Sequence, residues 1–205
     1  MSILNINNGG GGGSYIRFMP SANAWVFNKE EVTLTNLVFD HYSVRSGWGK
    51  MMEGQAPEWQ WDQRLGVQSP IPSQERDAKG NLVWKRGFSI NFYTKEMGVV
   101  EWSSTGTGPV IGFDQIFEEI WNAKDEHAGM VPVCKYGGSV PQKIGKGNTR
   151  VPNFSLVKWV KRDSIPWDAE QDDTPAPAPA AAPKAAAATT KKAAPPPADD
   201  DDLDF

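Results

Sequence analysis

The sequence has little of the chemistry on which many metalloproteins and secreted proteins depend. Its 205 residues include one cysteine, Cys134, and two histidines, His41 and His127. An intramolecular disulfide and a zinc site rich in Cys or His are therefore excluded. No run of about 18 apolar residues is present, which excludes a helical membrane span. The start of the chain, Met1–Asn5, lacks the basic and apolar regions of a signal peptide, so we expect a cytoplasmic protein.

Acidic charge is scarce in most of the chain and concentrated at its end. Residues 1–168 carry 18 Lys+Arg against 17 Asp+Glu, whereas residues 169–205 carry 3 against 8. Five consecutive glycines, 9–13, predict a flexible leader over 1–14. Nearly all aromatic residues lie between 15 and 168, which predicts one folded domain there. Residues 169–198 are rich in Ala and Pro and predict a disordered linker, followed by an acidic tip at 199–205.

The folded domain has the patterns of a mainly β protein with one helix. Apolar and polar residues alternate over 82–93, so Phe88, Ile90 and Phe92 share one face of a predicted strand. Further strands are predicted between residues 25 and 42 and over 98–104, 129–136 and 151–162. Spacings of three and four from Phe113 to Trp121 predict the helix. Glycine- or proline-rich segments predict loops at 46–50, 69–73 and 137–150 and a turn at 106–109.

A helix that follows several strands and precedes the last two occurs in five-stranded barrels of the OB type. We therefore predict a mainly β fold: an OB-fold-like five-stranded Greek-key barrel with one α-helix and a disordered C-terminal tail.

The acidic tip has the design of a recognition peptide. Its seven residues are Asp199, Asp200, Asp201, Asp202, Leu203, Asp204 and Phe205. An apolar residue at the end of a disordered chain is useful only if a partner receives it, with the aspartates steering the approach.

This tip, with the linker before it, resembles the C-terminal end of bacterial and phage single-stranded DNA-binding proteins, in which an OB-fold core precedes a linker and an acidic, Phe-terminated tip. Leu203 and Asp204 depart from the usual bacterial ending, Ile-Pro-Phe, which favours a phage protein acting in the host cytoplasm. The resemblance implies a protein that coats single-stranded DNA and recruits replication or recombination proteins such as a polymerase, helicase or nuclease.

Basic and aromatic residues alternate along parts of the domain in a way that suits single-stranded nucleic acid, because cations follow phosphates and aromatic faces stack on bases. No Asp or Glu occurs between His127 and Arg162, and none between Ala78 and Lys95. The predicted contacts are Trp48, Lys85, Arg86, Tyr93, Lys135, Tyr136, Lys143, Lys146, Arg150, Lys158, Trp159 and Lys161. For Tyr93 and Trp159 a place in the core is an equal alternative, and Trp59 and Trp61 fit either role.

Motifs for catalysis are weak. Gly145-Lys146-Gly147 lacks the Ser or Thr of a phosphate-binding loop, and the glycines from 106 to 112 miss the dinucleotide fingerprint by one residue. We expect no enzyme activity and no cofactor. Two alternatives stay open: a metal-dependent nuclease built around Glu118, Asp125 and Glu126, and a Trp-rich β-domain that binds protein or carbohydrate. Cys134, in a Val-rich segment, is predicted to be a small buried apolar residue.

Overall fold

The computed structural model describes residues 14–52, 56–145 and 147–167. The predicted leader (except Ser14), the linker and the acidic tip therefore lie outside the described residues. The strands are β1 (Tyr15–Met19), β2 (Ala24–Phe27), β3 (Glu30–Val32), β4 (Asn36–Lys50), β5 (Glu58–Trp61), β6 (Trp84–Thr94), β7 (Gly98–Ser104), β8 (Met130–Ile144) and β9 (Gly147–Lys161). Between β7 and β8 lie the helix α1 (Thr107–Ala123) and a 3-10 turn, η1 (Lys124–His127); a second turn, η2 (Arg162–Ser164), follows β9.

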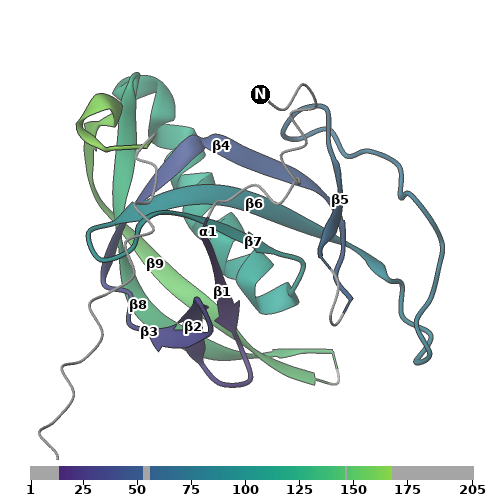
Figure 1. Cartoon of the computed structure of the whole chain (residues 1–205). Helices are drawn as coiled ribbons and strands as arrows, with labels where there is room; N and C mark the ends of the chain where they lie inside the picture. The colour runs from purple at the N-terminus through teal and green to yellow at the C-terminus, as the bar shows by residue number, and fades with distance from the viewer. Residues whose placement is uncertain (1–13, 53–55, 146, 168–205) are drawn as a thin grey trace, which may run out of the picture. The chain divides into compact units, whose positions relative to one another are not determined.

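The strands form one curled sheet that lies against α1 (Figure 1). Its order is β3-β2-β1-β7-β6-β4-β8-β9, and β5 pairs with the end of β4. The β1–β7 pairing is parallel and the others are antiparallel, so the sheet is mixed. A register shift between Asp40 and Arg45 bends β4 where it crosses β6. The predicted mainly β class with one α-helix in the described domain is confirmed, but nine strands are present rather than five.

The core lies between α1 and the inner face of the sheet. Phe88, Ile90 and Phe92 of β6 are buried there, as their alternation predicted. Phe113 of α1 stacks on Phe88 with ring centroids 4.1 Å apart. Cys134 is fully buried, and burial raises the pKa of its thiol to about 12, which confirms its role as a small core residue.

Two glycines set how closely α1 approaches β9. A Cβ atom on Gly108 would lie 2.2 Å from the carbonyl oxygen of Arg150, and one on Gly112 would lie 2.3 Å from that of Pro152. Gly108 lies in the first turn of α1, so the predicted turn at 106–109 is wrong for residues 107–109, because the helix begins at Thr107. The glycines are needed for close packing rather than for a turn.

Two predicted loops are strands in the structure. Residues 46–50 belong to β4, because Gly47 and Gly49 pair with Trp61 and Trp59 of β5. Most of the predicted loop 137–150 forms the outer half of a hairpin in which β8 pairs with β9 as far as Ile144 and Gly147. In both places the glycine content indicated a loop, whereas pairing with a neighbouring strand decides the structure.

Candidate functional site

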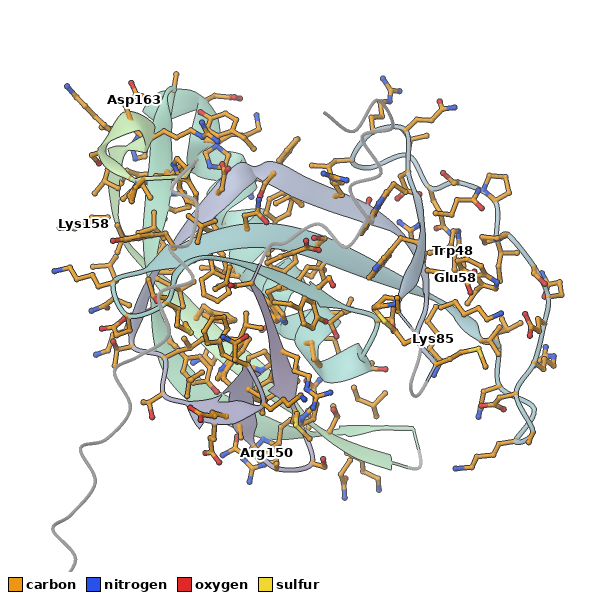
Figure 2. All side chains as sticks on the ribbon, viewed as in Figure 1. Trp48, Glu58, Lys85, Arg150, Lys158 and Asp163 are labelled. Carbon is orange, nitrogen blue, oxygen red and sulfur yellow. The ribbon has the colours of Figure 1, made fainter. Side chains whose placement is uncertain are left out.

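The outer face of β6, which points away from α1, runs the length of the domain. Tyr93, Asn91, Ser89, Gly87 and Lys85 lie on this side of the strand, opposite Phe88, Ile90 and Phe92, and of these Ser89 and Gly87 are themselves buried. A stretch of eight residues in a strand covers about 26 Å. Lys158 and Lys85 lie at opposite sides of the domain in Figure 2. We call this surface, with its neighbours on β4, β5, β8 and β9, the outer face.

One end of the outer face is a groove of about 530 Å³ lined by Tyr93 and Lys158. The strand register explains why these residues meet: Val38 pairs with Tyr93 on one side and with Val133 on the other, and Val133 pairs with Lys158. Valines form an apolar floor between the tyrosine ring and the ammonium group. Two predicted contacts that are far apart in the sequence therefore share one groove.

Cationic side chains border this groove. Lys95 lines it, beside Glu96, and Lys135 lies on the same face of β8 as Val133, two residues further along. Within the described residues, none of Lys95, Lys135 and Lys158 has an ion-pair partner. Their positive charge is therefore available to a ligand.

The other end of the outer face carries a stacked pair of indoles. The rings of Trp59 and Trp61 lie 4.4 Å apart and within 8° of parallel. They rest on glycines: a Cβ atom on Gly49 or Gly87 would come within 3.0 Å of the Trp59 ring. Arg45 lies over the Trp61 ring at 5.7 Å. Lys85 pairs with Gly49 at the edge of this cluster.

Sequence reasoning did not choose between a core and a surface role for Trp59 and Trp61, and it passed over Arg45. Two glycines spaced as Gly-x-Gly in 47–49 pair with two tryptophans spaced as Trp-x-Trp in 59–61. This match of small residues on one strand with large residues on its partner is the pattern in the sequence that could have identified the tryptophan pair.

Trp48 and Arg86 lie on the inner face instead, where each already has partners. The Trp48 indole Nε1 donates to the carbonyl oxygen of Ser69 at 2.8 Å. The Arg86 guanidinium binds both carboxylate oxygens of Asp62, at 2.9 and 2.5 Å, and lies 5.3 Å from the Trp48 ring. The structure therefore does not bring these two predicted contacts to the outer face.

Asp62 is the centre of that inner cluster. Its side chain also accepts hydrogen bonds from the Ser46 hydroxyl at 2.6 Å and the Ser69 amide at 2.9 Å. The hydrogen bonds from Arg86 hold the pKa of Asp62 well below its usual range. This network fixes the segment after β5 to the sheet.

Tyr136 and Trp159 have ring partners inside the domain. Tyr136 lies 5.8 Å from Trp25 and 5.5 Å from Phe154, and burial raises the pKa of its hydroxyl. Trp159 lies between His41, at 5.7 Å, and His127, at 4.5 Å, and packs against the core. Neither joins the outer-face clusters.

The remaining predicted cations lie elsewhere. Lys143 and Arg150 belong to the outer half of the β8–β9 hairpin, and Figure 2 shows Arg150 apart from both Lys85 and Lys158. Arg150 donates to the Ser139 hydroxyl at 3.4 Å. Lys161 is exposed at the end of β9, and Lys146 lies outside the described residues.

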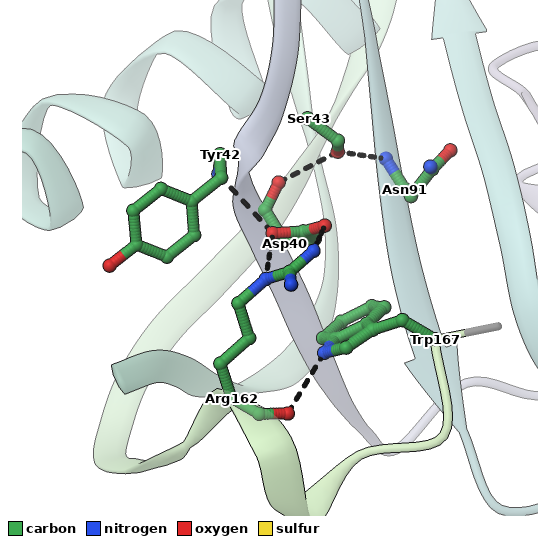
Figure 3. A network of polar contacts seen from close by, with 6 residues as sticks. All are labelled: Asp40, Tyr42, Ser43, Asn91, Arg162 and Trp167. Carbon is green, nitrogen blue, oxygen red and sulfur yellow. Dashed lines mark hydrogen bonds and ion pairs between the residues drawn. The ribbon is translucent and has the colours of Figure 1, made fainter. Parts of the chain in front are cut away.

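A polar network ties the end of the domain to β4 (Figure 3). The Arg162 guanidinium donates to both carboxylate oxygens of the buried Asp40, at 3.3 and 2.9 Å. The Trp167 indole donates to the carbonyl oxygen of Arg162 at 3.1 Å. Because Ser164 and Ile165 line the Tyr93 groove, this network holds the C-terminal end of the described domain beside that groove.

Among the described residues, no three His, Cys, Asp or Glu side chains gather where they could hold a metal ion. In the same part of the chain, no helix is long and apolar enough to span a membrane. Comparisons with protein-family models, with curated proteins and with solved structures found no match.

Proposed function

We propose that this protein binds single-stranded DNA along its outer face and recruits replication or recombination proteins through its acidic tip. The observation that carries the proposal is the arrangement of the outer face. Aromatic rings lie at both of its ends, Tyr93 at one and the Trp59–Trp61 pair at the other, beside lysines without ion pairs. Aromatic faces that stack on bases, together with cations that follow the phosphates, are the combination that binds single strands without sequence preference.

The strand arrangement supports the same function. Taken alone, β4, β6, β7, β8 and β9 form a sheet in which the first strand pairs with the second and the fourth, and α1 follows the third. This is the arrangement we expect of an OB-type barrel. Such barrels bind oligonucleotides on the face of strands 2 and 3 and with the loops between strands 1 and 2 and between strands 4 and 5. Here these are the outer faces of β6 and β7, the segment 51–83 and the β8–β9 hairpin.

The acidic tip lies outside the described residues, and its role rests on the sequence. Phe205 would fill an apolar pocket of a partner and Asp199–Asp202 would steer the approach. The same aspartates, on a linker of about 30 residues that averages on the order of 30 Å, would also compete with DNA phosphates for the domain's own lysines.

Stacking is tested with Tyr93→Ala and Trp59→Ala. We expect each variant to weaken binding of a short fluorescein-labelled oligo(dT) by about 5- to 150-fold, which corresponds to about 1–3 kcal/mol per lost stack. Fluorescence polarisation gives the affinities. Trp121→Ala is the control, because Trp121 is an exposed tryptophan of α1 and not of the outer face. On an oligonucleotide that holds a single copy, where contacts between copies play no part, it should bind normally. Equal affinity of Tyr93→Ala, Trp59→Ala and the wild type would contradict the proposed site, and cleavage of the strand in Mg²⁺ would favour a nuclease.

The salt dependence tests the lysines of the groove. Each phosphate contact contributes about 0.7 to the slope of log K against log salt for a single strand. Lys135→Ala combined with Lys158→Ala should therefore flatten the slope by up to about 1.4. Lys124→Ala should leave the slope unchanged, since this lysine already pairs with Asp125 at 2.7 Å. A slope that the double variant does not alter would remove both lysines from the site.

A separate prediction concerns the effect of the acidic tip on DNA affinity. Deleting residues 199–205 should raise the affinity for single strands, most clearly at low salt, because the competing aspartates are lost. Phe205→Ala keeps the aspartates, so its DNA affinity should stay near the wild-type value while partner capture is lost. Measurements at two salt concentrations and a pull-down of host proteins compare the two variants. If both variants capture every partner, the tip has no recruiting role.

A further inference from the structure

On the inner side of the sheet an apolar cavity of about 440 Å³ opens between α1, β4, β6 and the segment after β5. Phe88, Phe113 and Phe117 line it as a series of stacked rings, with centroids 4.1 and 5.3 Å apart. Trp121 completes the series and is 45% exposed. The cavity is of a size that receives ligands or side chains. An aromatic helix face left open beside such a cavity marks an interaction surface.

The free charges at this cavity are negative. Asp114 and Glu118 line it one helical turn apart, and neither has an ion-pair partner among the described residues. Arg86, the cation in the lining, is paired with Asp62. The cavity is therefore unsuited to nucleic acid or to the acidic tip, and it suits a segment that is both apolar and basic.

The β8–β9 hairpin of this chain has that composition. In Figure 1 its end projects from the body of the domain. Val140, 56% exposed, and Ile144 lie on one face of β8, four residues and so about 13 Å apart. Lys143 and Arg150 lie on the other face. A hairpin that only clamped phosphates would not need an exposed aliphatic side chain such as that of Val140, with the half-buried Ile144 beside it on the same face.

The dimensions of the two surfaces agree. The helix stripe from Val110 to Trp121 is about 16 Å long, which spans the separation of Val140 and Ile144. Neither of these residues lines the cavity of its own molecule, so the hairpin does not fill that cavity. Lys143 and Arg150 lie on the opposite face of the hairpin, so their charge attracts the carboxylates of Asp114 and Glu118 across the thickness of the hairpin rather than by direct contact.

We propose that the β8–β9 hairpin of one copy docks in the α1 cavity of a second copy. The contact joins two different surfaces, so a docked pair keeps one free hairpin and one free cavity, and the assembly grows head to tail. An interface of this size is weak. If the protein coats single strands, a consequence that rests on the proposed function, neighbouring copies would bind cooperatively along the strand.

Two complementary variants test the head-to-tail contact by sedimentation velocity of the full chain, without nucleic acid. The cavity variant, Asp114→Lys with Glu118→Lys, keeps a normal hairpin. The hairpin variant, Val140→Ser with Ile144→Ser, keeps a normal cavity. We expect the wild-type mass to rise with concentration and each variant alone to associate at least about tenfold more weakly. In an equimolar mixture, the intact hairpin of the cavity variant should dock in the intact cavity of the hairpin variant. The dimer should grow no further, because its remaining hairpin and its remaining cavity both carry the substitutions.

Glu30→Lys with Glu31→Lys is the matched control, since it makes the same charge change on β3 and should associate as the wild type does. Circular dichroism confirms that the variants are folded. A wild-type protein that stays monomeric at several hundred micromolar, or a mixture that associates no more than its components, would overturn the proposal. Since no nucleic acid is present, neither result bears on DNA binding.

Discussion

Gly112→Ala is expected to lower the free energy of unfolding by about 2–3 kcal/mol. Alanine is the better helix former by about 1 kcal/mol, so without a steric conflict this substitution in α1 would stabilise the domain. The added methyl group, however, would lie 2.3 Å from the carbonyl oxygen of Pro152. That oxygen belongs to the backbone of β9, so it can move only if the helix and the strand separate. The steric conflict therefore outweighs the helix preference of alanine, and the substitution destabilises the domain.

Urea unfolding followed by circular dichroism measures this effect, with Gly106→Ala as the control. At Gly106 a Cβ atom would lie 3.4 Å or more from its neighbours, and the backbone there has an ordinary extended conformation. The control should cost at most about 1 kcal/mol, through the weaker helix cap. A Gly112→Ala protein that is as stable as the wild type would show that α1 does not approach β9 as closely as described.

Asp62→Ala should be similarly destabilising, by about 2–3 kcal/mol, because it leaves Arg86, Ser46 and the Ser69 amide without their shared acceptor. The side chain of Asp62 is 2% exposed, whereas that of Arg86 is 33% exposed and so partly screened by water. Glu75→Ala removes the exposed Lys50–Glu75 pair of the same region and should cost less than about 1 kcal/mol.

The cost of losing Asp62 should depend on pH. The pKa of this carboxyl is lowered in the folded protein, so its contribution is fully present above the unfolded-state pKa of about 4. It is lost progressively as the pH falls below that value toward the lower folded-state pKa. The stability difference between wild type and Asp62→Ala should therefore be constant from about pH 5 to 7 and shrink below pH 4. A difference that grows in acid would mean that Asp62 is not ionised in the folded state.

The elements whose pattern is complete within one segment could be predicted from the sequence. The alternation from 82 to 93 identified β6 and its buried face, and the spacing from Phe113 to Ile120 identified the buried stripe of α1. In each case the burial of one periodic face dominates the local energetics.

The elements that depend on a distant partner could not be predicted. From the sequence, Gly47 and Gly49 indicate a loop. In the structure they belong to a strand, because the indoles of β5 occupy the space where larger side chains at these positions would lie. Arg86 shares a strand with Lys85 and has the same charge, yet only Arg86 meets Asp62, 24 residues earlier. The sequence identified the residue types of the candidate site, whereas strand pairing decided which of them share a face.

The tryptophans lie in different environments, so the intrinsic fluorescence of the protein has components that come from different surfaces. Trp25 and Trp102 are buried in the core and should emit at short wavelength whatever binds. Trp59 and Trp61 lie on the outer face, and Trp121 lies at the α1 cavity. An iodide-accessible, red-shifted component from Trp121 would then report on contacts between copies, while the stacked pair would report on ligands of the outer face. A single fluorescence titration could therefore follow ligand binding at the outer face and association at the α1 cavity together.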